Sequence, residues 1–407
     1  MDGARTVPPW LTVVGIGEDG TAGLSPIARA AIDDAEILVG GARHLAMIPD
    51  DGRRRIAWAS PMERTVAELA SLAGKRVTIV ATGDPMWFGI GATLRRTFAA
   101  DAMRVIPSPS AFSLAAARMG WPIADVECLT VHGRPLERIR AFAHPGRRLL
   151  VLSHDGATPL RAAAMLNEMG FGASTLTALS HLGGTQEDIV SAPAAEWGNR
   201  TVADLNTLAI ACVAAPGAKI FARVPGLPDD AFRHDGQLTK REVRAITLAA
   251  LAPLPSEHLW DIGAGCGSIA IEWLRSGPAM RASAVEQNTS RAAIIVENAL
   301  ALGVPDLAVV QGPAPDALAG LARPDAVFIG GGISNPKLLE TSWSALPSGG
   351  RLVANAVTLE GEGALIAARQ THGGDLVRLE VSHTEPIGRF TSWRPKLAVT
   401  QWRAVKP

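Results

Sequence analysis

Short apolar runs alternate along the first half of the chain with longer stretches in which apolar residues recur at helical spacing. Residues 11–16 form the first such run and predict a central strand followed by a glycine-containing loop. Residues 24–35 have helical spacing, and further strands are expected at residues 37–39 and 76–81. This alternation of strand and helix predicts an α/β fold built on parallel sheets.

The second half repeats the alternation in a more regular form. A buried strand at residues 258–262 leads through a glycine turn into a helix from Ser268, and the next strand ends at Glu286. The elements expected beyond it are helices at residues 290–302 and 362–372, and strands at residues 307–310, 325–329, 349–355, 376–382 and 396–402. The last two strands are expected to pair antiparallel, which completes a seven-stranded Rossmann-like sheet.

The glycine turn after residue 262 carries the most specific chemical signal in the sequence. It reads D-x-G-x-G-x-G, with the fixed positions occupied by Asp261, Gly263, Gly265 and Gly267. Glycines at alternate positions allow a sharp bend and let a ligand lie against main-chain amides. The following helix directs its partial positive charge at the turn. A nucleotide-like cofactor is therefore expected here.

The spacing separates two cofactors that such a turn could bind. A nicotinamide fingerprint would place its third glycine at position 268, where this chain has Ser268. The form present resembles the first motif of class I methyltransferases that use S-adenosylmethionine (SAM). Glu286 lies where a strand-end carboxylate accepts hydrogen bonds from ribose hydroxyls. The alternative is a glycine turn that binds no ligand.

Composition narrows the functional classes. The chain has 407 residues, of which 47% are hydrophobic and 19% charged, so it is long enough for two domains with buried cores. Lys plus Arg and Asp plus Glu both number 39, which argues against a nucleic-acid groove or an anionic membrane surface. Three cysteines lie far apart without a C-x-x-C pair, which argues against disulfides and a metal site. The sequence shows no signal peptide or membrane-spanning run, so a cytoplasmic protein is expected.

The first half resembles the class III, tetrapyrrole-type methyltransferases. The segments that carry the resemblance are LTVVGIG, PSPSAFSLAAARMGWP, LLVLSHDGATP, ALSHLGGTQEDI and the turn Gly83-Asp84-Pro85. The resemblance implies a two-lobed fold with SAM between the lobes, beside that turn and the turn that contains Ser110. It also implies that Gly15 and Gly17 shape a turn or line the substrate trough rather than hold the cofactor.

Two sites with histidine in the first half have two interpretations each. His132 follows a strand and is either a trough residue or a hydrogen-bonded strand-end histidine. His154 and Asp155 are either an acid/base pair or part of a turn in which Asp155 binds the backbone ahead of Gly156. No general base is assigned from the sequence.

The class I resemblance extends to later turns of the second half. Gly312 and Ala314 lie in the turn expected near adenine, where a proline replaces the usual acid and leaves backbone contacts. Gly330 begins the glycine run where class I enzymes place the reacting methyl group. Arg389 and Arg394 are candidate partners for substrate carboxylates, and a solvated charged hairpin is the alternative.

Domain boundaries and function follow from the two resemblances together. The expected domains are residues 1–222 of class III type and residues 238–407 of class I type, joined by a linker at residues 223–237 that is rich in Pro, Gly and charge. This order resembles the fused, decarboxylating C5,15-methyltransferases of cobalamin synthesis. The resemblance implies two SAM sites per chain, a tetrapyrrole substrate and a homo-oligomer. It also implies methylation of C5 by the first domain, and methylation of C15 with loss of carbon dioxide from the ring C acetate by the second.

Two alternatives stay open. One is a SAM methyltransferase that acts on another substrate, since class III relatives also modify diphthine and ribosomal RNA, although the balanced charge argues against RNA. The other is that one half binds SAM only as a non-catalytic scaffold. The sequence contains no nucleophilic triad, and no metal is expected, because an activated methyl group and a nucleophilic substrate carbon need chiefly to be aligned.

Overall fold

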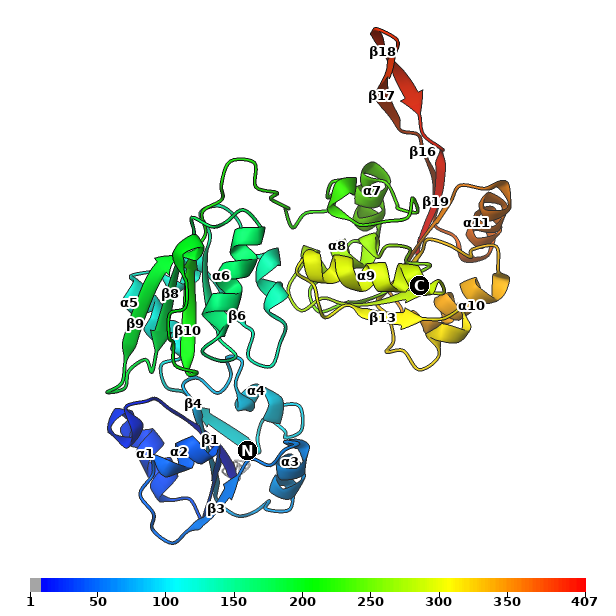
Figure 1. Cartoon of the computed structure of the whole chain (residues 1–407). Helices are drawn as coiled ribbons and strands as arrows, with labels where there is room; N and C mark the ends of the chain where they lie inside the picture. The colour runs from blue at the N-terminus through cyan, green and yellow to red at the C-terminus, as the bar shows by residue number, and fades with distance from the viewer. Residues whose placement is uncertain (1–8) are drawn as a thin grey trace. The chain divides into compact units, whose positions relative to one another are not determined.

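The computed structural model describes residues 9–407 and confirms the expected α/β class. The described residues divide into two compact units (Figure 1). Unit 1 extends to Leu136 and resumes over Phe142–Lys219, and unit 2 contains Glu137–Ala141 and Ile220–Pro407. Residues 1–8 of the expected first domain lie outside the described residues.

The first lobe of unit 1 is a parallel sheet. Its described strands have the order β3-β2-β4-β1-β5, so β4 and β1 are central, in register from Leu11↔Val77 to Ile16↔Thr82. Central parallel strands are covered on both faces, which is why their side chains are almost all apolar and buried. The elements are β1 (Leu11–Ile16), α1 (Pro26–Asp33), β2 (Ile37–Gly40), α2 (Ala42–Ala46), β3 (Arg54–Ala57), α3 (Glu63–Ala70), β4 (Val77–Thr82), α4 (Ile90–Leu94) and β5 (Met103–Ile106).

The second lobe of unit 1 is a mixed sheet. Its described strands have the order β6-β7-β10-β8-β9, with β6 parallel to β7 and the other neighbours antiparallel. Phe112, Ala115 and Ala116 of the helix that follows β5 pack on this sheet against Leu150 and Leu179. The elements are α5 (Ala111–Met119), β6 (Val126–Thr130), β7 (Arg148–Leu152), α6 (Thr158–Glu168), β8 (Thr175–Ser180), β9 (Asp188–Pro193) and β10 (Asn206–Ala211).

Unit 2 contains the expected class I sheet. The described strands have the order β13-β12-β11-β14-β15-β19-β16, of which the first five are parallel and β19 runs antiparallel to both neighbours. The carboxyl ends of the parallel strands therefore meet at one edge. The elements are α7 (Arg241–Leu251), β11 (His258–Ile262), α8 (Ser268–Ser276), β12 (Arg281–Glu286), α9 (Thr289–Ala301), β13 (Ala308–Gln311), β14 (Ala326–Ile329), α10 (Pro336–Ala345), β15 (Arg351–Ala356), α11 (Leu359–His372), β16 (Asp375–Leu379) and β19 (Val399–Val405).

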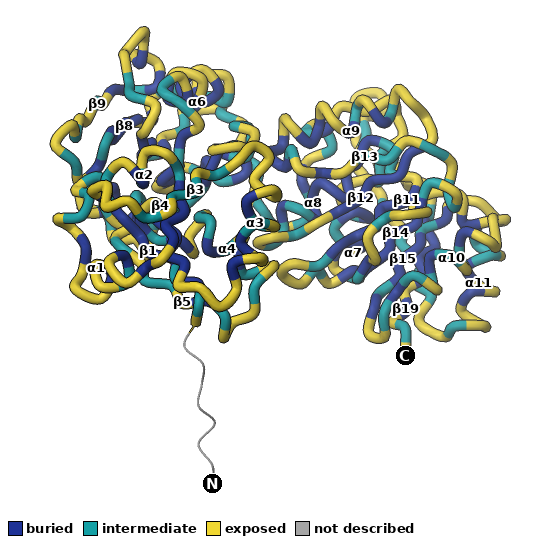
Figure 2. The backbone as a smooth tube through the Cα atoms, turned by 90° about the horizontal axis from the view of Figure 1, so that it is seen from below, coloured by how far each residue is buried: buried dark blue, intermediate teal, exposed yellow. Residues whose placement is uncertain are grey.

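The core of unit 2 lies on both faces of this sheet. Leu259 belongs to a buried cluster with Ile269 and Trp273, whereas its neighbour Trp260 belongs to a second cluster with Trp402. Successive side chains of a strand point to opposite faces, so β11 contributes to both clusters. Figure 2, in which the backbone is coloured by residue burial, shows buried residues along the strands of each unit and exposed residues in many connecting segments.

A hairpin connects β16 to β19, in the place where the sequence offered a solvated charged hairpin as the alternative to a substrate site. Its strands are β17 (Ser382–Ile387) and β18 (Phe390–Pro395), paired antiparallel. The hairpin extends beyond the sheet of unit 2 (Figure 1), and most of its residues are exposed, including Trp393.

The stretch expected as a linker folds onto unit 2. Leu227 and Phe232 are buried in the cluster that contains Leu248 and Ile269, and the Arg233 amide donates to Asn298 Oδ1 at 2.9 Å. Residues 223–237 therefore differ from the free connection that their composition suggested. Their irregular backbone was expected, but their two apolar side chains supply core contacts that Pro and Gly content does not reveal.

Candidate functional site

A cavity of about 630 Å³ lies between the two lobes of unit 1. We call it the interlobe cavity. The first lobe contributes Gly83 and Asp84, which follow β4, and the second lobe contributes Ser110, Leu179 and Asn206. Three of the four residues expected to hold SAM in this half, Gly83, Asp84 and Ser110, therefore line one space.

The two turns beside the cavity are held together by backbone contacts. The Gly83 amide donates to the Ile16 carbonyl at 3.0 Å, and the Ser108 amide donates to the Gly83 carbonyl at 3.1 Å. A Cβ at Gly15 would lie 1.8 Å from the Gly83 oxygen, so only glycine permits this approach. Gly15 thus shapes the turn, and Gly17 lines the cavity, as the resemblance implied.

The expected cofactor residues of unit 1 also have structural roles. Asp84 Oδ1 accepts a hydrogen bond from the Met86 amide at 2.8 Å, and Ser110 caps α5 by accepting from the Ser113 amide at 3.1 Å. Pro85 is buried and is not among the residues that line the cavity. These contacts fix both turns while leaving the Gly83 and Asp84 side of the cavity accessible to a ligand.

One wall of the cavity carries a polar cluster that the sequence did not indicate as a site. Glu18 accepts hydrogen bonds from Arg43 and from His181 Nδ1, the latter at 3.0 Å. His44 Nε2 lies 2.8 Å from Thr82 Oγ1, and burial, aided by the charge on Arg43, lowers the pKa of His44 to about 4. His44 is therefore neutral at neutral pH. His181 lies in a segment quoted for the resemblance, but nothing local marks it as a cavity residue.

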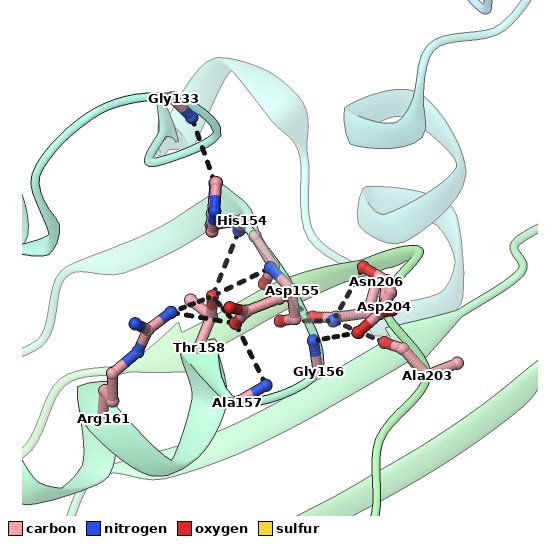
Figure 3. A network of polar contacts seen from close by, with 11 residues as sticks. Gly133, His154, Asp155, Gly156, Ala157, Thr158, Arg161, Ala203, Asp204 and Asn206 are labelled. Atoms are coloured by element: carbon pink, nitrogen blue, oxygen red, sulfur yellow. Dashed lines mark hydrogen bonds and ion pairs between the residues drawn. The ribbon is translucent and has the colours of Figure 1, made fainter.

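The two histidine interpretations in unit 1 are resolved by side-chain contacts. His132 lines the cavity, with its ring centroid 5.6 Å from that of His154. Asp155 turns away from His154 and accepts from the Ala157 amide at 3.1 Å, which is the turn interpretation (Figure 3). Its carboxylate also binds Arg161 at 2.9 Å, so Asp155 is not paired with His154 as acid and base.

The glycine turn of unit 2 has the backbone that its sequence predicted. Gly263, Gly265 and Gly267 have φ values of 68°, 60° and 79°, which lie in the left-handed region that favours glycine. A Cβ at Gly263 would lie 2.9 Å from the Gly331 amide nitrogen, whereas a Cβ at Gly265 would meet only the Gln237 oxygen, at 3.6 Å. The turn after β11 is thus packed closely against the turn after β14 and open at Gly265.

Two buried carboxylates flank this turn. Glu286 Oε2 accepts from the Gly265 amide at 2.8 Å and its Oε1 accepts from the Asn288 amide at 2.9 Å. Asp261 Oδ2 accepts from the Ala270 amide at 2.9 Å, while its buried Oδ1 has no hydrogen-bond partner among the described residues. Burial raises the pKa of Asp261 to about 7; the Ala270 amide opposes this effect, and the charge on Glu286 adds to it.

The remaining expected residues of unit 2 fall in two places. The Gly312 amide donates to the Glu286 carbonyl at 3.1 Å, which places the turn containing Ala314 beside the end of β12, and the Gly330 amide donates to the Ile262 carbonyl at 2.9 Å. Arg389 and Arg394 instead lie on the exposed hairpin. Arg394 Nε is 3.8 Å from Glu385, and Arg389 lies over the Phe390 ring.

The described residues offer few reactive groups of other kinds. No group of three or more His, Cys, Asp or Glu side chains within residues 9–407 is placed to hold a metal ion, and no helix there is long and apolar enough to cross a membrane. All three cysteines are free thiols. Burial raises the pKa of Cys128 to about 11 and that of Cys212 to about 12, and it also raises the pKa of Cys266.

Two family models match successive parts of the chain. The model described as tetrapyrrole (corrin/porphyrin) methylases matches residues 10–197, which fall in unit 1 apart from a short segment. The model described as a precorrin methyltransferase domain matches residues 230–406, within unit 2.

Curated relatives extend the match over nearly the whole chain. A precorrin-6Y C(5,15)-methyltransferase [decarboxylating] of a Sinorhizobium species is 48% identical over 404 residues, which cover 98% of this chain and 97% of that protein. A Mycobacterium tuberculosis protein of the same name is 43% identical over 398 residues, covering 97% of this chain and 100% of that protein. A Saccharolobus solfataricus protein, "Probable cobalt-precorrin-6B C(15)-methyltransferase (decarboxylating)", is 32% identical over 165 residues, covering 39% of this chain and 82% of that protein.

Proposed function

The chain belongs to the family of decarboxylating precorrin-6Y C(5,15)-methyltransferases, and on that premise we propose that it methylates C5 and C15 of precorrin-6Y and decarboxylates the ring C acetate in cobalamin biosynthesis. The observation that carries the proposal is the 48% identity with a relative of that name across 98% of this chain. An alignment of that extent includes both units, so both activities in the relative's name are carried over together.

SAM is the methyl donor of the proposal, with one site in each unit. In unit 1 the site is formed by the Gly83-Asp84-Pro85 turn and the Ser110 turn, at the interlobe cavity. In unit 2 a Cβ at Gly265 would meet only the Gln237 oxygen, at 3.6 Å, so the turn leaves room beside its main chain for a ligand. Each Glu286 oxygen accepts one amide and keeps a second lone pair, so it fits ribose hydroxyls as well. Gly312, Ala314 and Gly330 complete this site through their backbone.

The chain's own part in the chemistry is alignment and exclusion of water. When bound, SAM supplies a methyl group that is already activated on sulfur. Trp87 and Phe88 both contact Phe112 in the interlobe cavity, with ring centroids 4.9 and 5.9 Å from that of Phe112. The three rings present aromatic surface to a conjugated macrocycle. Arg134 lines the same cavity and is suited to hold a substrate carboxylate, whereas Arg43, which also lines it, is paired with Glu18.

The candidate substrate contacts of unit 2 lie on the exposed β17–β18 hairpin. Arg389 and Arg394 stay candidates for its carboxylates, and Arg394 would have to exchange its contact with Glu385 for one with substrate. A homo-oligomer in the cytoplasm also remains part of the proposal, together with a lack of nucleic-acid and membrane partners. The balanced charge of the chain supports the last point.

The flow of electrons in the macrocycle assigns C5 methylation to one unit, and C15 methylation with decarboxylation to the other. Loss of carbon dioxide leaves an electron pair beside ring C, and C15 adjoins that ring, whereas C5 lies across the macrocycle. Methyl capture at C15 can draw on the same electrons. The name of the Saccharolobus relative joins C(15) methylation to decarboxylation, which supports this pairing. We assign both steps to unit 2, around Gly263–Gly267, and C5 methylation to unit 1, around Gly83 and Asp84.

A pair of glycine variants tests the assignment with precorrin-6Y and SAM as substrates. Gly265→Arg fills the open side of the unit 2 turn and is expected to abolish carbon dioxide release. Gly83→Val places a side chain about 3.0 Å from Ser110 Cα, and a decarboxylated product with one added methyl group is expected from it. Carbon dioxide release that survives Gly265→Arg and is lost with Gly83→Val would reverse the assignment.

In a second candidate function, one unit binds SAM without catalysis. The number of SAM bound per chain and of methyl groups added per product distinguishes it from the proposed function. Calorimetric titration of the intact chain is expected to give two SAM per chain, and mass spectrometry two added methyl groups per product. Two bound SAM with only one added methyl group would favour the scaffold function instead. The room beside Gly265 and the cavity at Gly83 both support the two-site outcome.

A further inference from the structure

An acid and a histidine bridge the interlobe cavity from opposite lobes. Glu18 follows β1 in the first lobe, and His181 follows β8 in the second, 163 residues later. His181 Nδ1 lies 3.0 Å from Glu18 Oε2, and both residues line the cavity. Their side chains are 26% and 17% exposed, so the pair is largely shielded from solvent yet open to a ligand.

The hydrogen bond selects the tautomer of the imidazole. An ionised carboxylate can only accept, so Nδ1 carries the hydrogen that is shared with Glu18. Nε2 is then the nitrogen with a lone pair and is able to take a proton. If it does so, Glu18 stabilises the imidazolium that results, as a carboxylate does for a neighbouring cation. The pair has the chemistry of an oriented base.

The backbone at His181 is held in an uncommon conformation. Its φ is 48°, a left-handed value that few residues other than glycine adopt. The conformation is fixed by hydrogen bonds from the His181 amide to the Leu205 carbonyl at 3.1 Å and from the Gly184 amide to the His181 carbonyl at 2.9 Å. Such backbone strain persists where the surroundings impose it and is concentrated at functional sites.

The charged and titratable groups around the pair come from several elements. From the first lobe Arg43 binds Glu18, and neutral His44 lies beside Arg43. The other charged or titratable groups that line the cavity are Asp84, His132, Arg134, His154 and Asp204. Arg43 is paired with the Glu18 carboxylate, and His181 is the ring that this carboxylate holds directly.

We propose that His181, oriented by Glu18, accepts the proton that the macrocycle must lose when unit 1 adds its methyl group. This inference rests on the proposed function of unit 1. The bond from the substrate carbon to the methyl group forms as the bond from sulfur to methyl breaks, and the substrate gains one positive charge. Breaking an N–H or C–H bond of the macrocycle returns that charge as a proton to Nε2. The proton then passes from the imidazolium to water. Glu18 is a positioning residue in this scheme.

Two variants of His181 remove the proposed base and are compatible with the positive φ at this position. His181→Asn is tolerated at a positive φ but cannot take a proton at neutral pH, and His181→Gly relieves the strain and leaves space for added imidazole. Both are expected to retain two SAM sites, release carbon dioxide at the wild-type rate, and lower the rate of C5 methylation about 100-fold or more. Added imidazole is expected to restore part of that rate in His181→Gly only.

Glu18→Gln tests whether Glu18 orients and stabilises the His181 ring, through the pH dependence of C5 methylation. A neutral amide stabilises the imidazolium less than a carboxylate does, so the acidic limb of the pH profile for C5 methylation is expected to move to lower pH. Glu187→Gln is the matched control, since it removes a carboxylate that binds Arg118 from the same segment without lining the cavity. Its pH profile is expected to coincide with that of the wild type.

The outcomes separate this inference from the proposed function. A wild-type chain that adds no methyl group at C5 would contradict the proposed function itself. A wild-type chain that makes the doubly methylated product while His181→Asn makes it at the same rate would overturn only the role of His181. Loss of SAM binding in His181→Gly, without rescue by imidazole and with an unchanged pH limb in Glu18→Gln, would also overturn that role, because a structural contact explains it.

Discussion

Arg244 of α7 and Glu272 of α8 form a fully buried ion pair, with Nε and Oε1 2.6 Å apart and side chains 0% and 2% exposed. Each partner also binds the segment that precedes α7. The Gly226 and Leu227 amides donate to Glu272, and Arg244 donates to the Leu227 carbonyl. The pair therefore fastens an irregular segment to the core of unit 2.

The first prediction concerns where the two units can be separated. A fragment of residues 220–407 is expected to melt cooperatively, whereas one of residues 236–407 is expected to melt at a lower temperature or not cooperatively. The shorter fragment lacks Leu227 and Phe232 from the core and leaves Glu272 without its amide donors. Thermal unfolding followed by circular dichroism compares the two. Equal melting temperatures would mean that residues 220–235 contribute no stability.

The second prediction concerns the buried pair itself. Glu272→Ala is expected to lower the free energy of unfolding by about 3–5 kcal/mol, because a buried pair is broken. Arg244 then keeps only Asp229, 3.3 Å away and 32% exposed, as a counter-charge, and the Gly226 and Leu227 amides lose their acceptor. Glu297→Ala is the control: its pair with Arg233 is exposed at 51% and 66%, and its loss is expected to cost about 0–1 kcal/mol. Urea unfolding of the full chain measures both. Similar losses in the two variants would contradict the prediction.

The third prediction concerns Glu286. Glu286→Ala removes the acceptor proposed for ribose and also the acceptor of the Gly265 amide. Loss of hydrogen bonds to a charged group is worth roughly 1.5–3 kcal/mol, so SAM affinity is expected to fall about tenfold to a hundredfold at one site. Calorimetric titration of the full chain should show the second site unchanged. Two unchanged sites would leave Glu286 as a strand-end acid that only orders the turn.

The fourth prediction concerns the pH dependence caused by Asp261. Its folded pKa is raised by burial from 3.8 to about 7, so the native state holds a proton that the unfolded chain has lost. Between these values stability falls as the pH rises, because the native state binds more protons than the unfolded state. Asp261→Asn removes this effect.

The SAM-free full chain provides the measurement. Relative to the wild type, the melting temperature of Asp261→Asn is expected to be more favourable at about pH 7.5 than at about pH 4.5. A difference between the two proteins that is the same at both pH values would show that Asp261 is already ionised in the folded state at the lower pH.

The sequence predicted the sheet of unit 2 and its glycine turn because both are encoded locally. Strand β11, the glycines after it and Glu286 lie within one strand–helix–strand segment, and the short connections of such a segment fix their geometry. The antiparallel pairing of β16 with β19 was also correct, since apolar strands at the end of the chain have one open edge to join.

Contacts between distant segments could not be predicted in the same way. Glu18 and His181 meet only because the two lobes of unit 1 close around a cavity, and neither residue is unusual within its own segment. The sequence offered the β17–β18 hairpin only as an alternative, and its two strands were not predicted for another reason. Its residues are exposed on both faces, so no apolar alternation marks it, and only the two-residue loop Gly388-Arg389 between Ile387 and Phe390 gives a turn signal.

The three thiols, two buried and Cys128 half-buried, have a consequence for labelling chemistry. Maleimides react with thiolates, and burial keeps Cys128, Cys212 and Cys266 protonated well above neutral pH. A cysteine placed at an exposed position of each unit, as in Ile27→Cys and Leu359→Cys, is therefore expected to react ahead of all three. A donor and an acceptor dye can thus be attached to the otherwise native chain, and energy transfer between them can report in solution whether SAM draws the two units together.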